Sequence, residues 1–473
     1  MRLDDTNLST PRWARAADVL TVLLALVALV VAFTGGERVT LFGMRLSVTS
    51  WVRPAVWALL VTAVRHKFVP RPSLYRLLLV PRTPRHETLA AVLPAVVVSR
   101  AAVLLVGLIA VYVFGFPLDE GPVAPTSEPA NLLARWDTGW YLHIVKNGYR
   151  PSADLAGQQN IVFFPLYPLL TRAVGELIGE RWLLAGFLVT IGAFAGALAY
   201  LFRLGKRVCR TPEGPALSIA LLAAYPFAVF YGAVYTEALF LLCAAGAFYH
   251  ALRRQPLAAA GWALAAGLTR PNGVLLVVPL AVIVAVLAWP RLARPGTWVS
   301  GPFEPADGAR LTAADLLMVA APAIGLGIYT AYIWWLAGDP LAWMRAQTAW
   351  GRGYEGLRAL IPDPFLRRGL FGALKLSTPN TLNSLAGFFA LCVAVPVTRY
   401  YGLAFGLFVA LNVLVPMATG GPTSLGRFTS VLFPMFIYLA DAVPARHRPY
   451  WIAVFAMGQA LVATMFFTWR ELY

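Results

Sequence analysis

The sequence predicts an all-α polytopic membrane protein, and three observations carry this prediction. Of the 473 residues, 59% are hydrophobic and only 13% are charged, with a mean hydropathy of +0.67, far from the balance of a soluble globular protein. Apolar runs long enough to cross the hydrocarbon core as helices, about twenty residues each, recur along the whole chain. Short basic segments separate them, as expected of cytoplasmic loops.

The formal net charge of +17 does not indicate nucleic-acid binding. Lys and Arg lie in short segments between apolar runs, not along one face with interleaved aromatic residues. The three cysteines, Cys209, Cys243 and Cys392, are odd in number and widely spaced, so they imply neither a disulfide framework nor a zinc site.

Residues 1–88 are expected to form an N-terminal two-helix membrane segment. An apolar run over about 16–34 is long for a signal-peptide core and lacks a cleavage pattern, which favours a retained anchor with a cytoplasmic N-terminus. A second run near 51–64 precedes the densest basic segment of the chain, which is therefore expected to form a cytoplasmic loop. Its basic residues are Arg65, Lys67, Arg71, Arg76, Arg82 and Arg85.

Residues 89–473 are expected to form one further transmembrane domain. Its spans are expected near 89–114, 182–204, 216–235, 238–252, 257–268, 274–289, 313–337, 384–397, 403–418, 429–442 and 451–467, which gives about 13 helices for the whole chain. Two polar segments, about 115–160 and 338–376, fall on the extracytoplasmic side by the alternation of spans. The proline-broken stretch over 163–170 favours an interfacial or re-entrant helix.

The first outer segment carries an acid among aromatic residues, in the sequence Arg135-Trp136-Asp137-Thr138-Gly139-Trp140-Tyr141-Leu142-His143-Ile144. Partial desolvation raises the basicity of a carboxylate, which suits Asp137 as a general base at a membrane surface. The alternative role is structural, because an Asp before Thr-Gly can cap the short helix expected to follow it.

Two further motifs lie at predicted outer ends of spans: Tyr235-Thr236-Glu237-Ala238-Leu239-Phe240 and Gly267-Leu268-Thr269-Arg270-Pro271-Asn272-Gly273. Together with the Asp137 segment and the stretches over 147–149 and 163–168, they resemble, in the same order, the PIG-V-type mannosyltransferase family. That family has Tyr-Ser-Glu-Ser-Leu-Phe and Thr-Arg-Ser-Asn-Gly in the two positions. The resemblance covers roughly residue 89 to the C-terminus and is strongest up to about residue 280.

The resemblance implies a GT-C-type glycosyltransferase. Such an enzyme takes a sugar, here mannose, from a polyprenyl-phosphate-linked donor and passes it to an extracytoplasmic glycan or glycolipid acceptor with inversion. The resemblance also implies a catalytic acid in the first outer loop, and Asp137 occupies that position. The expected location is a bacterial plasma membrane, with membrane lipids as further partners and the active site on the extracytoplasmic face.

A phosphate that leaves during the transfer must be met by cations, and the planar fork of arginine suits this role. Arg270 and Arg427 are favoured as donor phosphate ligands, because each lies at an outer end of a span; Arg427 also follows a glycine-rich backbone that a ligand can approach closely. Snorkelling toward lipid headgroups is the alternative role for each. The full set of outer-side candidates is Arg135, Lys146, Arg270, Arg345, Arg352 and Arg427.

Glu237 lies between two apolar runs, where an unpaired charge costs about 2.5–3.5 kcal/mol or more. It is therefore expected to be hydrated or paired, with Arg270 as the candidate partner; stabilisation of the helix that follows is the alternative. His143 has no neighbouring His or Cys and is expected to support the site through hydrogen bonds. The remaining substrate-binding or supporting candidates are Arg135, Trp136, Trp140, Tyr141 and Asn272.

No cofactor is expected. Asp137, Asp154, Glu237 and Asp339 leave a divalent cation open, but no ligand spacing demands one. The chain lacks a Gly-x-x-x-x-Gly-Lys-Ser/Thr loop, which agrees with a lipid-linked donor. Aromatic residues of the second outer segment suit either sugar stacking or anchoring at the headgroup level.

A non-catalytic transporter or flippase for lipid-linked sugars is the rival function. The absence of an evident internal repeat counts mildly against it, because many transporter folds are built from paired halves.

Overall fold

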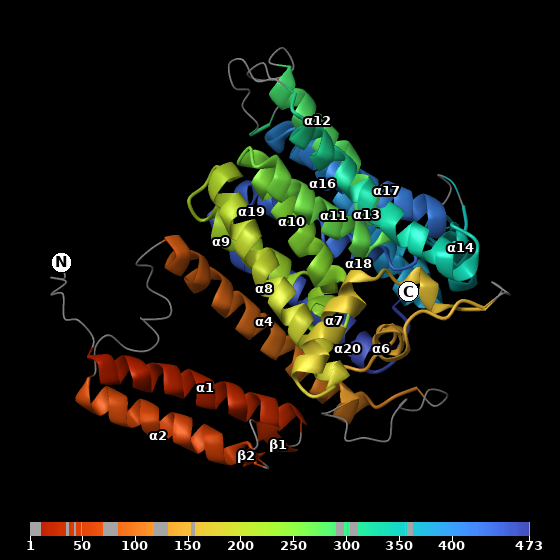
Figure 1. The fold of residues 1–473 in the computed structure, drawn as a ribbon. Helices are drawn as coiled ribbons and strands as arrows, with labels where there is room; N and C mark the ends of the chain where they lie inside the picture. The colour runs from red at the N-terminus through yellow and green to blue at the C-terminus, as the bar shows by residue number, and fades with distance from the viewer. Residues whose placement is uncertain are drawn as a thin grey trace. The chain divides into compact units, whose positions relative to one another are not determined.

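The computed structural model describes residues 11–34, 37–41, 44–48, 50–69, 84–117, 131–152, 157–289, 298–299, 301–302, 311–354, 356 and 363–472. The chain divides into two compact units, Met1–Ala91 with Pro122–Leu132, and Val92–Gly121 with Leu133–Tyr473. Regular structure is almost entirely helical (Figure 1), which confirms the predicted fold class of an all-α polytopic membrane protein.

In the first unit, α1 (Arg12–Thr34) and α2 (Val52–Phe68) are joined by an antiparallel hairpin of β1 (Glu37–Leu41) and β2 (Met44–Val48), which the sequence did not predict. Arg65 of the predicted cytoplasmic loop lies in α2, is 1% exposed, and places Nε 2.7 Å from Asp18 Oδ1 of α1. The pair joins the two helices. Arg71, Arg76 and Arg82 of that loop lie outside the described residues.

Within the described residues, seven helices are long and apolar enough to cross a membrane, or eight if one bent pair is a single span. The predicted total of about 13 spans stays a prediction. The long helices include α4 (Pro84–Phe114), α8 (Trp182–Val208), α13 (Ala313–Ala337), α16 (Thr378–Tyr401), α17 (Leu403–Gly420) and α20 (Arg448–Phe467), and η3 (Pro271–Leu276) continues into α12 (Val277–Ala288) as one further candidate span. Shorter apolar helices include α10 (Glu237–Leu252), α11 (Pro256–Thr269) and α19 (Phe433–Ala442).

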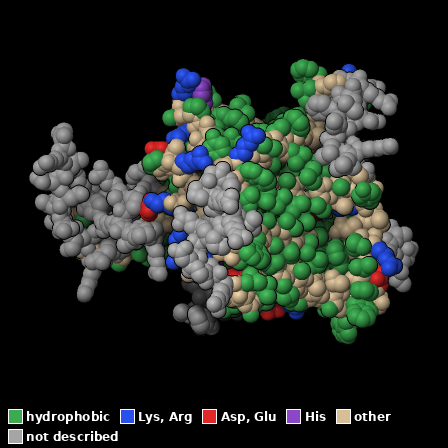
Figure 2. All heavy atoms as spheres, turned by 90° about the horizontal axis from the view of Figure 1, so that it is seen from above, with side chains coloured by type: hydrophobic (Ala, Val, Ile, Leu, Met, Phe, Trp, Pro, Cys, Tyr) green, Lys and Arg blue, Asp and Glu red, His purple; other side chains and the backbone are tan. Residues whose placement is uncertain are grey.

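Large hydrophobic side chains are exposed along these helices, as a lipid-facing surface requires. Figure 2 shows one face on which hydrophobic side chains gather over a wide area. The exposed set includes Val97, Val98, Leu105 and Ile109 of α4, Ile328 and Trp335 of α13, and Val454 and Met457 of α20.

The bent pair corrects the expectation of one continuous span over 216–235. Helix α9 (Gly214–Ala224) and the 3-10 helix η2 (Pro226–Gly232) meet at an angle of 84°. The carbonyls near the break are satisfied by side chains, as backbone at membrane depth requires. Arg100 donates to Ala223 O and Ala228 O at 3.2 and 2.6 Å, and Gln459 donates to Ala223 O and Tyr225 O at 2.9 and 3.1 Å.

Close backbone contact fixes α11 against α13. A Cβ on Gly267 of α11 would collide with the carbonyl of Pro322, and one on Gly325 of α13 would collide with that of Leu264. Glycine therefore permits the approach that positions the end of α11, where Arg270 follows.

Short helices fill the polar segments between the long ones. They are α6 (Thr138–Asn147), η1 (Asn160–Val162), α7 (Leu166–Leu177), η3 (Pro271–Leu276), α14 (Ala342–Arg345), η5 (Ala346–Trp350), α15 (Asp363–Leu376), α18 (Leu425–Ser430) and η7 (Ala445–His447). The helix expected over 163–170 is present as α7, which begins at Leu166.

Candidate active site

Asp137 immediately precedes α6, but its carboxylate does not cap that helix. Oδ2 instead accepts a 2.8 Å hydrogen bond from Nη1 of Arg427, and the backbone N–H of Asp137 donates to the hydroxyl of Tyr235 at 3.0 Å. The Asp137 side chain is 14% exposed. This geometry rules out the capping alternative, because the carboxylate binds Arg427 and makes no hydrogen bond to the backbone at the start of α6.

Arg427 connects two acids. Its Nε lies 2.9 Å from Glu237 Oε1, while Nη1 holds Asp137. The guanidinium also lies over the rings of Phe230 and Tyr235, 5.0 and 4.7 Å from their centroids. Only 10% of the side chain is exposed, so lipid-headgroup snorkelling is not its arrangement here.

The local sequence explains how α18 presents Arg427. Gly421 has φ 57° and Ser424 has φ 61°, so the chain reverses sharply after α17. Gly426 packs on the ring of Phe227 with no room for a Cβ, and its N–H donates to Asn383 Oδ1 at 2.6 Å. The glycine-rich stretch thus permits tight packing against the protein's own side chains.

Glu237 begins α10 and is fully buried. Its Oε1 accepts from both Arg270 Nη1, at 2.7 Å, and Arg427 Nε, at 2.9 Å. Oε2 is buried and has no hydrogen-bond partner among the described residues. The expected pairing of Glu237 with Arg270 is therefore present, and a second arginine shares it.

Arg270 is extended between α11 and η3, with φ −155° and ψ 152°. The following Pro271 disfavours helical backbone at this residue, which ends α11 there. Its guanidinium lies 4.8 Å from the centroid of Phe428. Asn272, in η3, donates to Asn412 Oδ1 at 2.9 Å and leaves its own buried Oδ1 without a partner among the described residues.

A third arginine reaches this cluster from the second polar segment. Arg352 follows η5, and its guanidinium lies 5.3 Å from the centroid of Phe428. Burial, and then the charges of Arg427 and Arg270, lower the pKa of Arg352 to about 10, so it stays protonated at neutral pH. We call Asp137, Glu237, Arg270, Arg352 and Arg427 the charged cluster.

Three aromatic residues, Trp140, Phe163 and Trp350, pack together, and we call them the aromatic layer. Trp140 follows Asp137 closely in the sequence. It stacks on Phe163, with ring centroids 6.0 Å apart, and meets Trp350 edge-on at 5.2 Å. Phe163 also meets Trp350 edge-on at 5.4 Å. Trp350 Nε1 is buried with no hydrogen-bond partner among the described residues. Tyr141 packs edge-on against Phe163 and places its hydroxyl 3.4 Å from Thr236 Oγ1.

Three candidates from the first polar segment have structural contacts instead of lying in the charged cluster. Arg135 is fully buried and donates to Phe467 O at 2.8 Å. Trp136, at φ 52°, donates from Nε1 to Phe466 O at 3.1 Å and packs on Trp469. Both therefore tie this segment to the end of α20. His143 places Nδ1 3.3 Å from Asn160 Nδ2.

Arg352 was named among the outer-side cations but was not favoured as a site residue. The signal available was the run Trp350-Gly351-Arg352, which places an aromatic ring and a cation on either side of a glycine. Phe428, whose ring lies near both Arg270 and Arg352, was also missed. Arg345, by contrast, is 62% exposed and lies 3.3 Å from Asp339, outside the cluster.

The described part of the chain holds no group of three His, Cys, Asp or Glu placed to bind a metal ion. Asp154, one of the four acids considered for this, lies outside the described residues.

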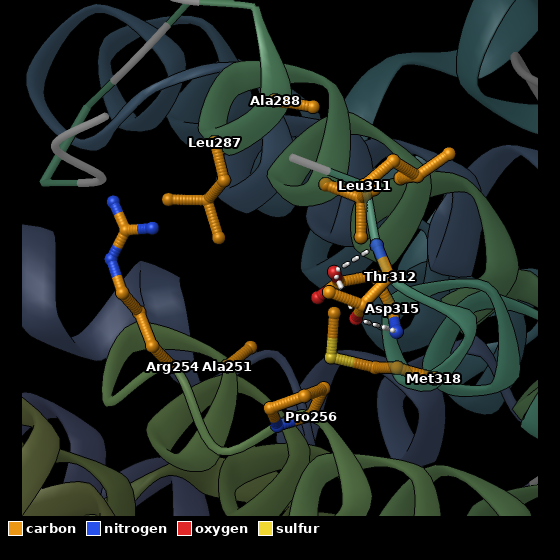
Figure 3. A pocket seen from close by; sticks show the side chains of 10 residues that line it. Ala251, Arg254, Pro256, Leu287, Ala288, Leu311, Thr312, Asp315 and Met318 are labelled. Carbon is orange, nitrogen blue, oxygen red and sulfur yellow. Dashed lines mark hydrogen bonds between the residues drawn. The ribbon is translucent and has the colours of Figure 1, made fainter. Parts of the chain in front are cut away.

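A cavity of about 290 Å³ lies at the other end of α11 (Figure 3). Helix α11 runs for 14 residues from Pro256 to Thr269, just before Arg270, a rise of about 20 Å. The Asp315 carboxylate there accepts from the backbone and hydroxyl of Thr312 as part of a helix cap. The candidate chemistry therefore lies in the charged cluster and not in this cavity. Its lining residues are Ala251, Arg254, Pro256, Val284, Leu287, Ala288, Leu311, Thr312, Asp315 and Met318.

Fold and site together define a multi-pass membrane protein with a cluster of arginines and carboxylates beside an aromatic layer. Residues 126–289 match the family model described as mannosyltransferase (PIG-V), which confirms the family resemblance inferred from the three motifs. The matched segment includes Asp137, Glu237 and Arg270 and supports a membrane glycosyltransferase. No curated protein matches the chain.

Among solved structures, the chain is similar to oligosaccharyltransferases of Archaeoglobus fulgidus. One, tethered to an acceptor peptide, is 11% identical with a TM-score of 0.39, over 78% of this chain and 55% of that chain. Another, in complex with an inhibitory peptide and a dolichol-phosphate, is 12% identical with a TM-score of 0.37, over 79% and 56%. The chain thus spans just over half the length of these proteins.

Proposed function

We propose that this protein is a GT-C-type mannosyltransferase. It moves mannose from a polyprenyl-phosphate-linked donor to a glycan or glycolipid acceptor on the extracytoplasmic face of a bacterial plasma membrane. The observation that carries the proposal is the position of Asp137, a partly exposed carboxylate that caps nothing and lies in a cluster with three arginines.

Asp137 is the general base of the proposed reaction. It accepts the proton of the acceptor hydroxyl, whose oxygen attacks the anomeric carbon from the face opposite the phosphate. The bond between that carbon and the phosphate oxygen breaks, and the lipid phosphate leaves with the electron pair. One displacement inverts the anomeric centre and needs one base.

The arginines supply the positive charge that the departing phosphate requires. Arg427 also fixes Asp137, which orients the base before substrate arrives. The aromatic layer of Trp140, Phe163 and Trp350 provides flat apolar faces of the kind that stack on sugar rings, and the Nε1 of Trp350 offers a donor for a hydroxyl.

The test uses purified protein with radiolabelled polyprenyl-phosphate-mannose and a panel of mannoside acceptors. The expected result is transfer of label to an acceptor with inverted configuration. If no sugar moves to any acceptor, the proposal fails. Movement of intact donor across vesicles without transfer would instead support the rival transporter or flippase function.

A further inference from the structure

Arg352 differs from the other two arginines of the charged cluster because it has no acidic partner within the part of the chain that the structure describes. Arg270 pairs with Glu237, and Arg427 pairs with both Glu237 and Asp137. Among the described residues, Arg352 forms no ion pair, and its guanidinium donates one long hydrogen bond, 3.5 Å, to Thr423 O. Of the three arginines in the cluster, Arg352 is therefore the one without a carboxylate contact, although the charge of Asp137 acts on it from further away.

The backbone directs Arg352 toward the cluster. Gly351 is left-handed, with φ 69°, and ends η5, so the chain turns just before Arg352. A Cβ on Gly420 would lie 3.0 Å from Arg352 Nη1, so glycine at the end of α17 makes room for the guanidinium. Gly351 and Gly420, which lie on two separate segments, thus allow the position of the Arg352 side chain.

The electrostatics of the cluster favour an anion. Three guanidinium groups face two carboxylates, which leaves one net positive charge. A cation largely removed from water without a counter-ion is unfavourable. Burial, and then the charges of Arg427 and Arg270, lower the pKa of Arg352, and the charge of Asp137 offsets this in part. A bound anion would supply the missing counter-charge and would reduce the repulsion among the three arginines.

We propose that Arg352 is the arginine of the cluster that binds the phosphate of the lipid-linked donor, while Arg270 and Arg427 hold Glu237 and Asp137 in place. This inference rests on the proposed function and refines the roles of its residues. Guanidinium and phosphate match in geometry through two parallel hydrogen bonds. Trp350, two residues earlier, then lies where the sugar attached to that phosphate can meet the aromatic layer.

The test measures equilibrium binding of radiolabelled polyprenyl-phosphate-mannose, without acceptor, to detergent-solubilised protein. R352Q is expected to weaken binding about ten- to a hundredfold, the loss of a hydrogen-bonded partner to a charged group. R352K keeps the charge without the fork and is expected to bind with intermediate affinity. R345Q, in the same polar segment but exposed and outside the cluster, is the matched control and should bind like the wild type.

Unphosphorylated polyprenol distinguishes phosphate recognition from a structural role. Its affinity should be the same in wild type and R352Q, because the missing contact is to phosphate. An equal loss for donor and polyprenol, or an unchanged donor affinity in R352Q, would overturn the inference. If R352Q does not fold, R352K decides the question by the same comparison.

The binding and transfer assays separate this inference from the proposed function. Arg352-dependent donor binding without transfer to any acceptor would remove the glycosyltransferase proposal and leave Arg352 as a phosphate ligand. Transfer with donor affinity unchanged in R352Q would leave the enzyme and remove this role. A wild-type protein that does not bind the donor contradicts both.

Discussion

Asp137 and Arg427 lie 290 positions apart in the sequence, and their side chains form an ion pair of 2.8 Å. The pair joins the start of α6 to α18. Since the same guanidinium also binds the fully buried Glu237, the candidate base is anchored through Arg427 to the protein interior. The orientation of Asp137 therefore depends on Arg427 and Glu237, which are both far from it in the sequence.

Substitution D137N is expected to lower kcat by about 10²- to 10⁴-fold, the usual contribution of a general base. Asparagine keeps an acceptor for Arg427, so folding should be preserved. The measurement is mannose transfer at saturating donor, with D339N, an acid of the second polar segment paired with Arg345, as the control. Full activity in D137N would remove Asp137 from the mechanism.

Substitution E237Q is expected to destabilise the protein strongly. Removing one partner of a buried ion pair costs about 3–5 kcal/mol. Here Arg270 loses its counter-charge, and Arg427 keeps only Asp137. The midpoint of thermal unfolding in detergent should fall well below that of E176Q. Glu176 is 57% exposed in a surface pair with Arg172, where about 0–1 kcal/mol is expected. Equal midpoints would contradict the structural importance of Glu237.

Substitution W140L is expected to raise the KM for donor or acceptor by about two- to tenfold, the loss of a ring–ring or ring–sugar contact. Trp140 holds one side of the aromatic layer through Phe163 and Trp350. W335L removes an indole that is 79% exposed on α13 and serves as the control. The same KM for both variants would mean that the aromatic layer does not contact substrate.

Substitution R135K is expected to lower stability without changing the KM for donor. Arg135 donates to Phe467 O and lies over the Trp469 ring, so it anchors the end of α20. A lysine cannot reproduce this directional contact. Thermal unfolding and donor saturation curves check the two parts, and a raised donor KM with unchanged stability would assign Arg135 to phosphate binding after all.

Chelation of divalent cations by EDTA is expected to leave transfer unchanged. Both carboxylates of the cluster already bind arginine, so the negative charge that would attract a cation is compensated. The measurement is the transfer rate after EDTA treatment, with and without added Mg²⁺ or Mn²⁺. Activity that disappears with EDTA and returns with one of these ions would show a metal requirement.

The membrane architecture was predictable because hydropathy reports directly on burial in lipid. Glu237 and Arg270 were predicted as partners for the same reason, since a carboxylate among apolar residues needs a counter-charge. The angle of 84° at Tyr225 was not predictable, because hydropathy does not distinguish a broken span from a straight one. Arg65 was expected in the basic loop but lies in α2, where it pairs with Asp18 of α1, a contact that hydropathy does not report.

Which arginines of the charged cluster pair with a carboxylate could not be derived from sequence. Arg270, Arg352 and Arg427 come from three separate segments, and only their packing shows which of them meet a carboxylate. Arg135 sits beside Asp137 in the chain, yet its side chain leaves in another direction and binds a carbonyl. Arg135, named as a supporting candidate beside Asp137, thus lies outside the charged cluster, whereas Asp137 lies in it.

The hydrogen bonds from Arg100 to the carbonyls at the α9–η2 break have a consequence for biosynthesis. Ala228, whose carbonyl Arg100 binds at 2.6 Å, follows it by 128 residues. At about 5–20 residues per second, α4 waits roughly 6–25 s for this partner to be made. Until then the arginine imposes about 2.5–3.5 kcal/mol on the insertion of its helix. We therefore expect helix α4 to become a fully stable membrane span only after the middle of the chain has been synthesised and has folded against it.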